Sequence, residues 1–203
     1  MRRDENATGS RGCRRARVLM AAAAIGLAPA ALPRAVLLVA QEPAVEREAV
    51  PRPVAAPGDV ESVDAILLAV YDVISGGAGV PRDWDRMRSL FVPDARLIPI
   101  VPSPGDGRPV ARFMSVEEWI EGAARHFSEN PFWETEVARV EERYGAMAHA
   151  FSTYESRAEA DGEAFARGIN SFQLLWDGDR WWIVNIFWAQ ERTGTPIPDR
   201  YLP

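Results

Sequence analysis

The chain has 203 residues, 47% of them hydrophobic and 26% charged, which allows one globular domain with appendages. Its charge is uneven, because residues 1–40 hold seven Arg against two acids, whereas residues 41–203 hold 16 Arg against 27 acids, a net charge of −11. A body this acidic is repelled by phosphate, which argues against nucleic-acid binding and against electrostatic attachment to anionic lipid.

An apolar run near the start of the chain predicts an export segment. Four Arg precede an apolar run over residues 18–32, which is the pattern of a secretory signal peptide. Small residues suited to cleavage occur at 28–30 and at 38–40. The alternative is a retained membrane anchor over residues 18–40, but Pro33-Arg34 would then place a charge inside the bilayer. We therefore expect an exported protein, periplasmic or secreted, that contacts a membrane only through an uncleaved leader.

Residues 41–57 carry four prolines and no hydrophobic period, which predicts an extended linker outside the core. The globular domain is then expected over residues 58–192, followed by a C-terminal tail over residues 193–203. Cys13, the single cysteine, lies in the leader. No disulfide and no thiolate metal site is therefore expected in the mature chain.

Two helices are expected at the start of the domain. Asp59 is a candidate cap for the first, whose apolar residues recur every three or four positions up to Ile74. The second helix is short, follows Pro81 and is expected to end at Pro93.

A strand and a third helix are expected next. Residues 97–101 are apolar and interrupted by proline, as in an edge strand, and residues 110–113 can return beside them. Ser115 and Glu118 have the spacing of a capping box and predict the start of the third helix. Its buried face would include Trp119.

The rest of the domain predicts antiparallel sheet. Two hairpins are expected, because paired runs rich in β-formers are joined by short turns that contain Gly145 and Gly178. Helices followed by long strands indicate an α+β fold with the helices packed on one face of the sheet. The four strands are expected at residues 134–144, 147–157, 165–176 and 181–190.

The last hairpin is apolar on both faces. If Trp176 pairs with Trp181, strict alternation places Asn170 and Asn185 together on one face and Trp188 on the other. An outer sheet of an isolated monomer would have one polar face. We therefore expect one face to meet the helices and the other to form a homodimer through the sheet.

Two segments carry a resemblance to a known family. They are R-G-I-N-S-F-Q-L-L-W-D-G-D-R-W-W-I-V-N-I-F-W-A-Q-E (167–191) and H-A-F-S-T-Y-E-S-R (149–157). With three helices ahead of them, they resemble the NTF2-like superfamily, and in particular its SnoaL-like bacterial proteins. The resemblance implies a cone of about three N-terminal helices packed on a strongly curved antiparallel sheet. It also implies a ligand pocket between the two.

Enzymatic members of this superfamily can be compared residue by residue. Against ketosteroid isomerase, Tyr71 matches the tyrosine of helix 1, but Pro99 stands at the position of the base and Phe172 near that of the second acid. A proton shuttle needs its base, so this set is incomplete. Against scytalone dehydratase, Tyr71-Asp72 matches a shared pair, whereas His149 only approximates one of two catalytic histidines.

One functional hypothesis is therefore a cofactor-independent lyase or isomerase that uses Tyr71, His149 and Glu155. A histidine near a carboxylate can serve as a general base. The alternative is a structural role, in which His149 packs at the rim of the sheet or in a dimer interface. The two histidines of the chain lack metal-ligand spacing, and no nucleotide motif is present, so neither a metal nor a cofactor is expected.

The leading hypothesis is binding of a small, mostly apolar molecule in the cone. Asn170 and Asn185 lie among aromatic residues, where a buried amide needs a partner or a ligand. Trp119 and Trp188 are the tryptophans expected at the pocket. A third reading is a structural dimer whose cavity is filled by its own side chains.

Overall fold

The computed structural model describes residues 52–192 and 194–203. The predicted export segment over residues 1–40 and most of the predicted linker lie outside the described residues. Within the part of the chain that is described, no helix has the length and apolar character needed to cross a membrane.

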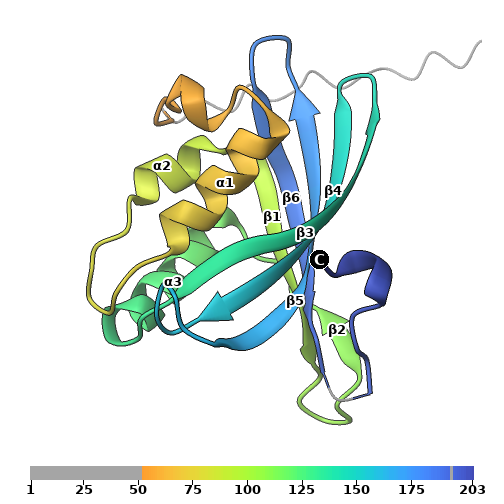
Figure 1. Ribbon diagram of the computed structural model, residues 1–203. Helices are drawn as coiled ribbons and strands as arrows, with labels where there is room; N and C mark the ends of the chain where they lie inside the picture. Colours follow the sequence, from red (N-terminus) through yellow and green to blue (C-terminus); the bar gives the residue numbers. More distant parts are fainter. Residues whose placement is uncertain (1–51, 193) are drawn as a thin grey trace, which may run out of the picture. The chain divides into compact units, whose positions relative to one another are not determined.

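Three helices lie on one side of a six-stranded sheet whose long strands curve around them (Figure 1). The strand order is β2-β1-β6-β5-β4-β3, and all neighbours are antiparallel except β1 and β6, which are parallel. The α+β class with a curved sheet is therefore confirmed, although the sheet is mixed. The elements are α1 (Val63–Ile74), α2 (Trp84–Ser89), α3 (Val116–Glu129), β1 (Phe91–Pro102), β2 (Pro109–Ala111), β3 (Trp133–Tyr144), β4 (Met147–Arg157), β5 (Ala164–Trp176) and β6 (Trp181–Gln190), with short 3-10 helices η1 (Pro57–Asp59) and η2 (Asp199–Tyr201).

Side-chain caps begin the helices, one of them at an unexpected residue. The cap of α1 is Ser62, whose side chain accepts a hydrogen bond from the amide of Ala65, so the assignment of Asp59 was wrong. Asp59 lies in η1 and its carboxylate binds the guanidinium of Arg86 at 2.8 Å. The capping box that begins α3 is confirmed.

The predicted edge strand is wrong in position and length. β1 begins at Phe91, earlier than expected, and lies between β2 and β6. Its pairing with β6 shifts register between Phe91 and Arg96, and Asp94 within that gap has φ of 62°. Pro93 is tolerated because a bulge needs no ladder hydrogen bond from its nitrogen.

The two hairpins are confirmed to within one residue at each strand end. Trp176 pairs with Trp181 as predicted. Positive φ at Gly145 (57°) and Gly178 (112°) explains why glycine stands in these two turns.

A β-bulge at Val184 changes which side chains of β6 face the helices. The register of β6 shifts by one residue at Gln173 of β5, which leaves Val184 as the extra residue. Trp188 therefore lies on the helix side together with Asn170, whereas Asn185 lies on the outer side. The prediction that the two asparagines share a face is wrong for this reason.

The chain packs against the domain beyond the predicted limits of 58–192 at both ends. Ala55 is buried, and Arg52 donates a hydrogen bond of 2.9 Å to a main-chain carbonyl of β1, so this part of the predicted linker does contribute to the core. The C-terminal tail lies on the side of the sheet opposite the helices (Figure 1). It is held there by Thr153, whose hydroxyl donates to the carbonyl of Tyr201 at 2.6 Å.

Candidate functional site

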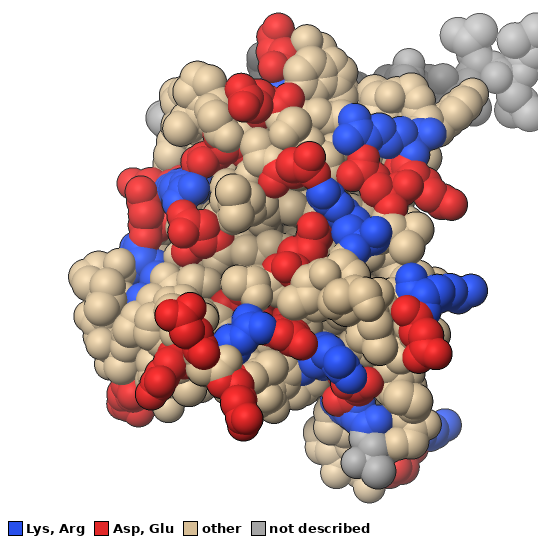
Figure 2. Space-filling view, viewed as in Figure 1, with Lys and Arg blue, Asp and Glu red and all other residues tan. Residues whose placement is uncertain are grey.

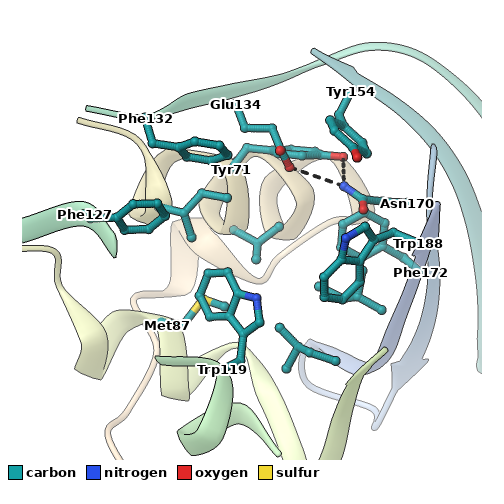
Figure 3. Close-up of a pocket in the computed structure, with 14 residues that line it drawn as sticks. Tyr71, Met87, Trp119, Phe127, Phe132, Glu134, Tyr154, Asn170, Phe172 and Trp188 are labelled. Carbon is teal, nitrogen blue, oxygen red and sulfur yellow. Dashed lines mark hydrogen bonds between the residues drawn. The ribbon is translucent and has the colours of Figure 1, made fainter. Parts of the chain in front are cut away.

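A cavity of about 230 Å³ lies between the helices and the concave side of the sheet (Figure 3). Polar side-chain groups come from four residues that share one end of it: Tyr71, Glu134, Tyr154 and Asn170. The remaining lining residues are apolar or indole side chains, namely Val70, Ile74, Met87, Leu97, Trp119, Phe127, Phe132, Phe172, Ile186 and Trp188.

Hydrogen bonds join the end of α1 to the start of β3 and hold Tyr71 and Glu134 beside each other. The hydroxyl of Ser75 donates to the carbonyl of Tyr71 at 2.7 Å and accepts from the amide of Glu134 at 3.0 Å. Gly76 and Phe132 exchange two main-chain hydrogen bonds of 2.7 and 3.0 Å. Tyr71, one turn before the helix end, is thereby held close to Glu134.

Glu134 is half-buried, and part of its surface opens onto the cavity. One carboxyl oxygen accepts from the hydroxyl of Ser156 at 2.9 Å, and the other accepts from the amide nitrogen of Asn170 at 3.4 Å. Burial raises the pKa of Glu134 to about 7, and the two hydrogen bonds oppose part of that rise. Near neutral pH the side chain is therefore present in both the ionised and the protonated form.

Tyr71 is the centre of a hydrogen-bonded chain that leads away from the cavity. Its oxygen accepts from the amide nitrogen of Asn170 at 3.1 Å and lies 2.7 Å from the hydroxyl oxygen of Ser152. Ser152 donates its only hydrogen to Glu136, so Tyr71 must donate to Ser152. Burial and the nearby Glu134 both raise the pKa of Tyr71. Its proton thus points away from the cavity and is held tightly.

Five of the ten remaining lining residues are aromatic (Figure 3). Phe127 and Phe132 are stacked with ring centres 5.1 Å apart. Trp84 lies behind them, stacked on Phe127 at 6.4 Å and edge-on to Trp119 at 6.4 Å. Because these rings pack against one another, the apolar end of the cavity has a fixed shape.

No family model and no curated protein matches the sequence. Solved structures do resemble the domain. A protein of unknown function with a cystatin-like fold from Nostoc punctiforme PCC 73102 is 9% identical, with a TM-score of 0.49 over 66% of this chain and 91% of that one. An NTF-2 like protein of unknown function from Silicibacter pomeroyi DSS-3 is 14% identical, with a TM-score of 0.45 over 64% and 94%. An NTF2-like protein from Methylobacillus flagellatus KT is 21% identical, with a TM-score of 0.39 over 64% and 95%.

Three helices packed on a curved sheet, with a cavity between them, are the arrangement that the sequence resemblance implies. This geometry fits the NTF2-like cone that the resemblance of residues 149–157 and 167–191 implies. The likeness to these solved structures says nothing of a ligand or a reaction.

Four of the predicted site residues line the cavity of this cone. They are Tyr71, Trp119, Asn170 and Trp188. Trp188 reaches the cavity because of the bulge in β6, which strict alternation did not anticipate.

The other three predicted site residues lie on the outer face of the sheet. His149 and Glu155 occupy odd positions of β4, whose even positions face the helices, and Asn185 follows the bulge of β6. The ring of His149 lies 3.0 Å from the hydroxyl of Ser171, and Glu155 forms an ion pair with Arg157. A catalytic set that joins Tyr71 to His149 and Glu155 does not fit this geometry.

Glu134 is the site residue that the sequence analysis missed. In F-W-E-T-E (132–136), Phe132, Glu134 and Glu136 are spaced two residues apart. In a strand they therefore point to the same face, which places a carboxyl on the face of an apolar residue. This spacing could have indicated a carboxyl at the cavity, but the second half of the strand is polar and hides the pattern. The carboxyl of this cone thus lies on β3. The comparison with ketosteroid isomerase placed the base at Pro99 instead.

The described residues that line the cavity include one carboxyl and no arginine or histidine. Nowhere in the described part of the chain do three His, Cys, Asp or Glu residues gather as a metal site would require.

Proposed function

We propose that the domain binds one small, mostly apolar molecule in the cavity, with a polar group of that molecule at Glu134 and Asn170. The observation that carries the proposal is an aromatic cavity whose hydrogen-bonding groups meet at one end. Such a division is typical of small-molecule sites, which hold most of a ligand by apolar contact and orient it by a few polar groups. A volume of about 230 Å³ lies below the range of about 300–1,000 Å³ for larger ligands, so a molecule of one ring and a short chain suits it.

The third reading, a structural dimer with a filled interior, has less support. Its premise is a cone packed by its own side chains, whereas the described residues leave a cavity there.

A cavity-filling substitution tests the proposal. Val70→Phe places a ring where a buried residue of α1 lines the cavity, and Leu68→Phe makes the same kind of change at a side chain that is 71% exposed on the same helix. Small molecules that copurify with the full chain would be extracted from both variants and from the wild type, and identified by mass spectrometry. We expect a molecule in stoichiometric amount with the wild type and Leu68→Phe, and its loss with Val70→Phe. Equal amounts in all three samples would contradict the proposal.

A second candidate function is proton transfer by Glu134. It is favoured by one observation, a carboxyl in an apolar cavity whose pKa is about 7, because a general acid or base is most effective when its pKa lies near the working pH. Asn170 and Ser156 would hold the carboxyl in place, while Tyr71 orients Asn170. This is a lyase or isomerase hypothesis built on Glu134 in place of His149.

Turnover of the copurifying molecule separates binding from catalysis. Wild type, Glu134→Gln and His149→Ala would be compared, with Glu142→Gln as the matched control, since Glu142 lies on the same strand but on its outer face opposite His149. Catalysis by Glu134 predicts a loss of at least about a hundredfold in Glu134→Gln alone. Equal rates in Glu134→Gln and the wild type would eliminate this mechanism and leave binding.

A further inference from the structure

We infer that the ligand is a small amine whose ammonium group pairs with the carboxylate of Glu134 while aromatic rings enclose its apolar part. The inference rests on the proposed binding function and names the chemical class of its ligand.

The first observation is an uncompensated negative charge. Ionised Glu134 has two hydrogen-bond donors, Ser156 and Asn170, but no cationic side chain lies among the described residues that line the cavity. Arg82 lies against the wall, 5.2 Å from the centre of the Phe127 ring, yet it is held by four main-chain carbonyls and does not line the cavity. A buried carboxylate without a counter-ion is costly. An ammonium group is the ligand part that would remove this cost.

The second observation is the kind of surface that surrounds the carboxyl. Trp119, Trp188, Phe172 and Tyr154 line the same small space as Glu134 (Figure 3). The face of an aromatic ring attracts a cation, by about 0.5–1 kcal/mol in water and about 2 kcal/mol or more where the cation is desolvated. Aromatic rings around a single carboxylate therefore favour an ammonium group over a neutral group of the same size.

The third observation is the charge of the whole domain. Residues 58–192 hold 13 Arg against 23 acids, a net charge of −10, and acidic side chains outnumber basic ones over the face shown in Figure 2. Such a field raises the local concentration of cations and lowers that of anions. A carboxylate or phosphate ligand would meet repulsion both at the surface and at Glu134.

Hydrogen bonding gives the remaining alternative, a neutral ligand whose oxygen accepts from protonated Glu134. An ammonium needs ionised Glu134, whereas a carbonyl acceptor needs protonated Glu134, so these two alternatives respond to pH in opposite directions. An alcohol can hydrogen-bond to either form of the carboxyl. The titratable neighbours of Glu134 are Tyr71 on α1, Tyr154 on β4 and Glu136 on β3. Burial raises the pKa of both tyrosines, so they stay neutral. The cavity-lining residues of β5 and β6 have no titratable group; they are Asn170, Phe172, Ile186 and Trp188.

Three probes of one size test the inference on the folded protein by titration calorimetry: 2-phenylethylamine, 2-phenylethanol and phenylacetate. At pH 8 we expect the amine to bind at least about tenfold tighter than the alcohol and phenylacetate not to bind. At pH 5.5 the amine's advantage should shrink, because Glu134 is then protonated. In the wild type at pH 7, titrations in two buffers of different ionisation enthalpy should show proton release when the amine binds.

Variants then assign the effect to the carboxyl. Glu134→Gln should lose the preference for the amine while it still binds the alcohol, and Glu142→Gln, on the outer face of the same strand, should keep it. An alcohol that binds as tightly as the amine, or proton uptake on amine binding, would overturn the inference. The proposed function would still stand in that case if Val70→Phe abolished binding of the alcohol. Failure of all three probes to bind would overturn both.

Discussion

The carboxyl of Glu134 has surroundings that oppose its ionisation. Burial is the larger effect, and the hydrogen bonds from Ser156 and Asn170 offset part of it. Groups of this kind gather at functional sites, because a binding or catalytic group is useful only where water does not satisfy it. Most other acidic side chains of the domain with a shifted pKa are exposed or paired with arginine, and their pKa is lowered.

The raised pKa makes a prediction for stability. A carboxyl whose pKa is higher in the folded than in the unfolded chain stabilises the fold below the unfolded value of 4.5, and this contribution is lost as the pH rises through about 7. The free energy of unfolding of the wild type, relative to Glu134→Gln, should therefore fall between pH 5 and pH 8. Urea denaturation at a series of pH values measures it. Parallel curves for the two proteins would contradict the prediction.

The sequence predicted the pairing within each hairpin, but it did not predict the bulge in β6 or the pairing of β1 with β6. Turn glycines and periodicity predicted the two hairpins to within a residue, and the capping box predicted α3. The bulge at Val184 was not predictable, because its neighbours are apolar on both sides and either alternation suits them. The bulge determines that Trp188 reaches the cavity and that Asn185 does not. The parallel contact of β1 with β6 joins segments far apart in the chain, which periodicity cannot detect.

Close packing of β5 against its neighbours makes a second prediction. A Cβ at Gly168 would lie 2.4 Å from the hydroxyl of Tyr154 and 2.5 Å from the carbonyl oxygen of Ala189. Gly168→Ala should therefore displace Tyr154 or β6 and lower the free energy of unfolding by about 1–3 kcal/mol in urea denaturation. Gly122→Ala is the control, since a Cβ there meets nothing within 4 Å and alanine favours a helix. Equal stability of the two variants would show that the contact is relaxed.

Exposed apolar side chains on the outer face of the sheet bear on the oligomeric state of the molecule. Leu175 and Phe187 are 39% and 40% exposed there, beside the half-buried His149. Gln173 and Asn185 lie between these two side chains on that face, and Leu175 lies opposite Met147, which is 54% exposed. Exposed apolar side chains of this kind are what a partner subunit would cover. The homodimer through the sheet and export on residues 1–40 remain predictions, the second because those residues lie outside the described chain.

Analytical ultracentrifugation at tens of micromolar tests the dimer. We expect the wild type to sediment as a dimer and Phe187→Glu to sediment as a monomer, because a charge buried at the interface is costly. Leu68→Glu changes an exposed side chain of α1, a helix on the opposite side of the sheet from Phe187, and should remain dimeric. A monomeric wild type would rule out the homodimer.

The central claim is that Glu134 is a desolvated carboxyl in a ligand cavity, and its own titration tests this most directly. Carbon-13 NMR of protein labelled at the glutamate carboxyl carbons, with Glu134→Gln to assign the resonance, gives the pKa of this group alone. A value of about 7 is predicted. A value near 4.5, that of an ordinary solvated glutamate, would contradict the account.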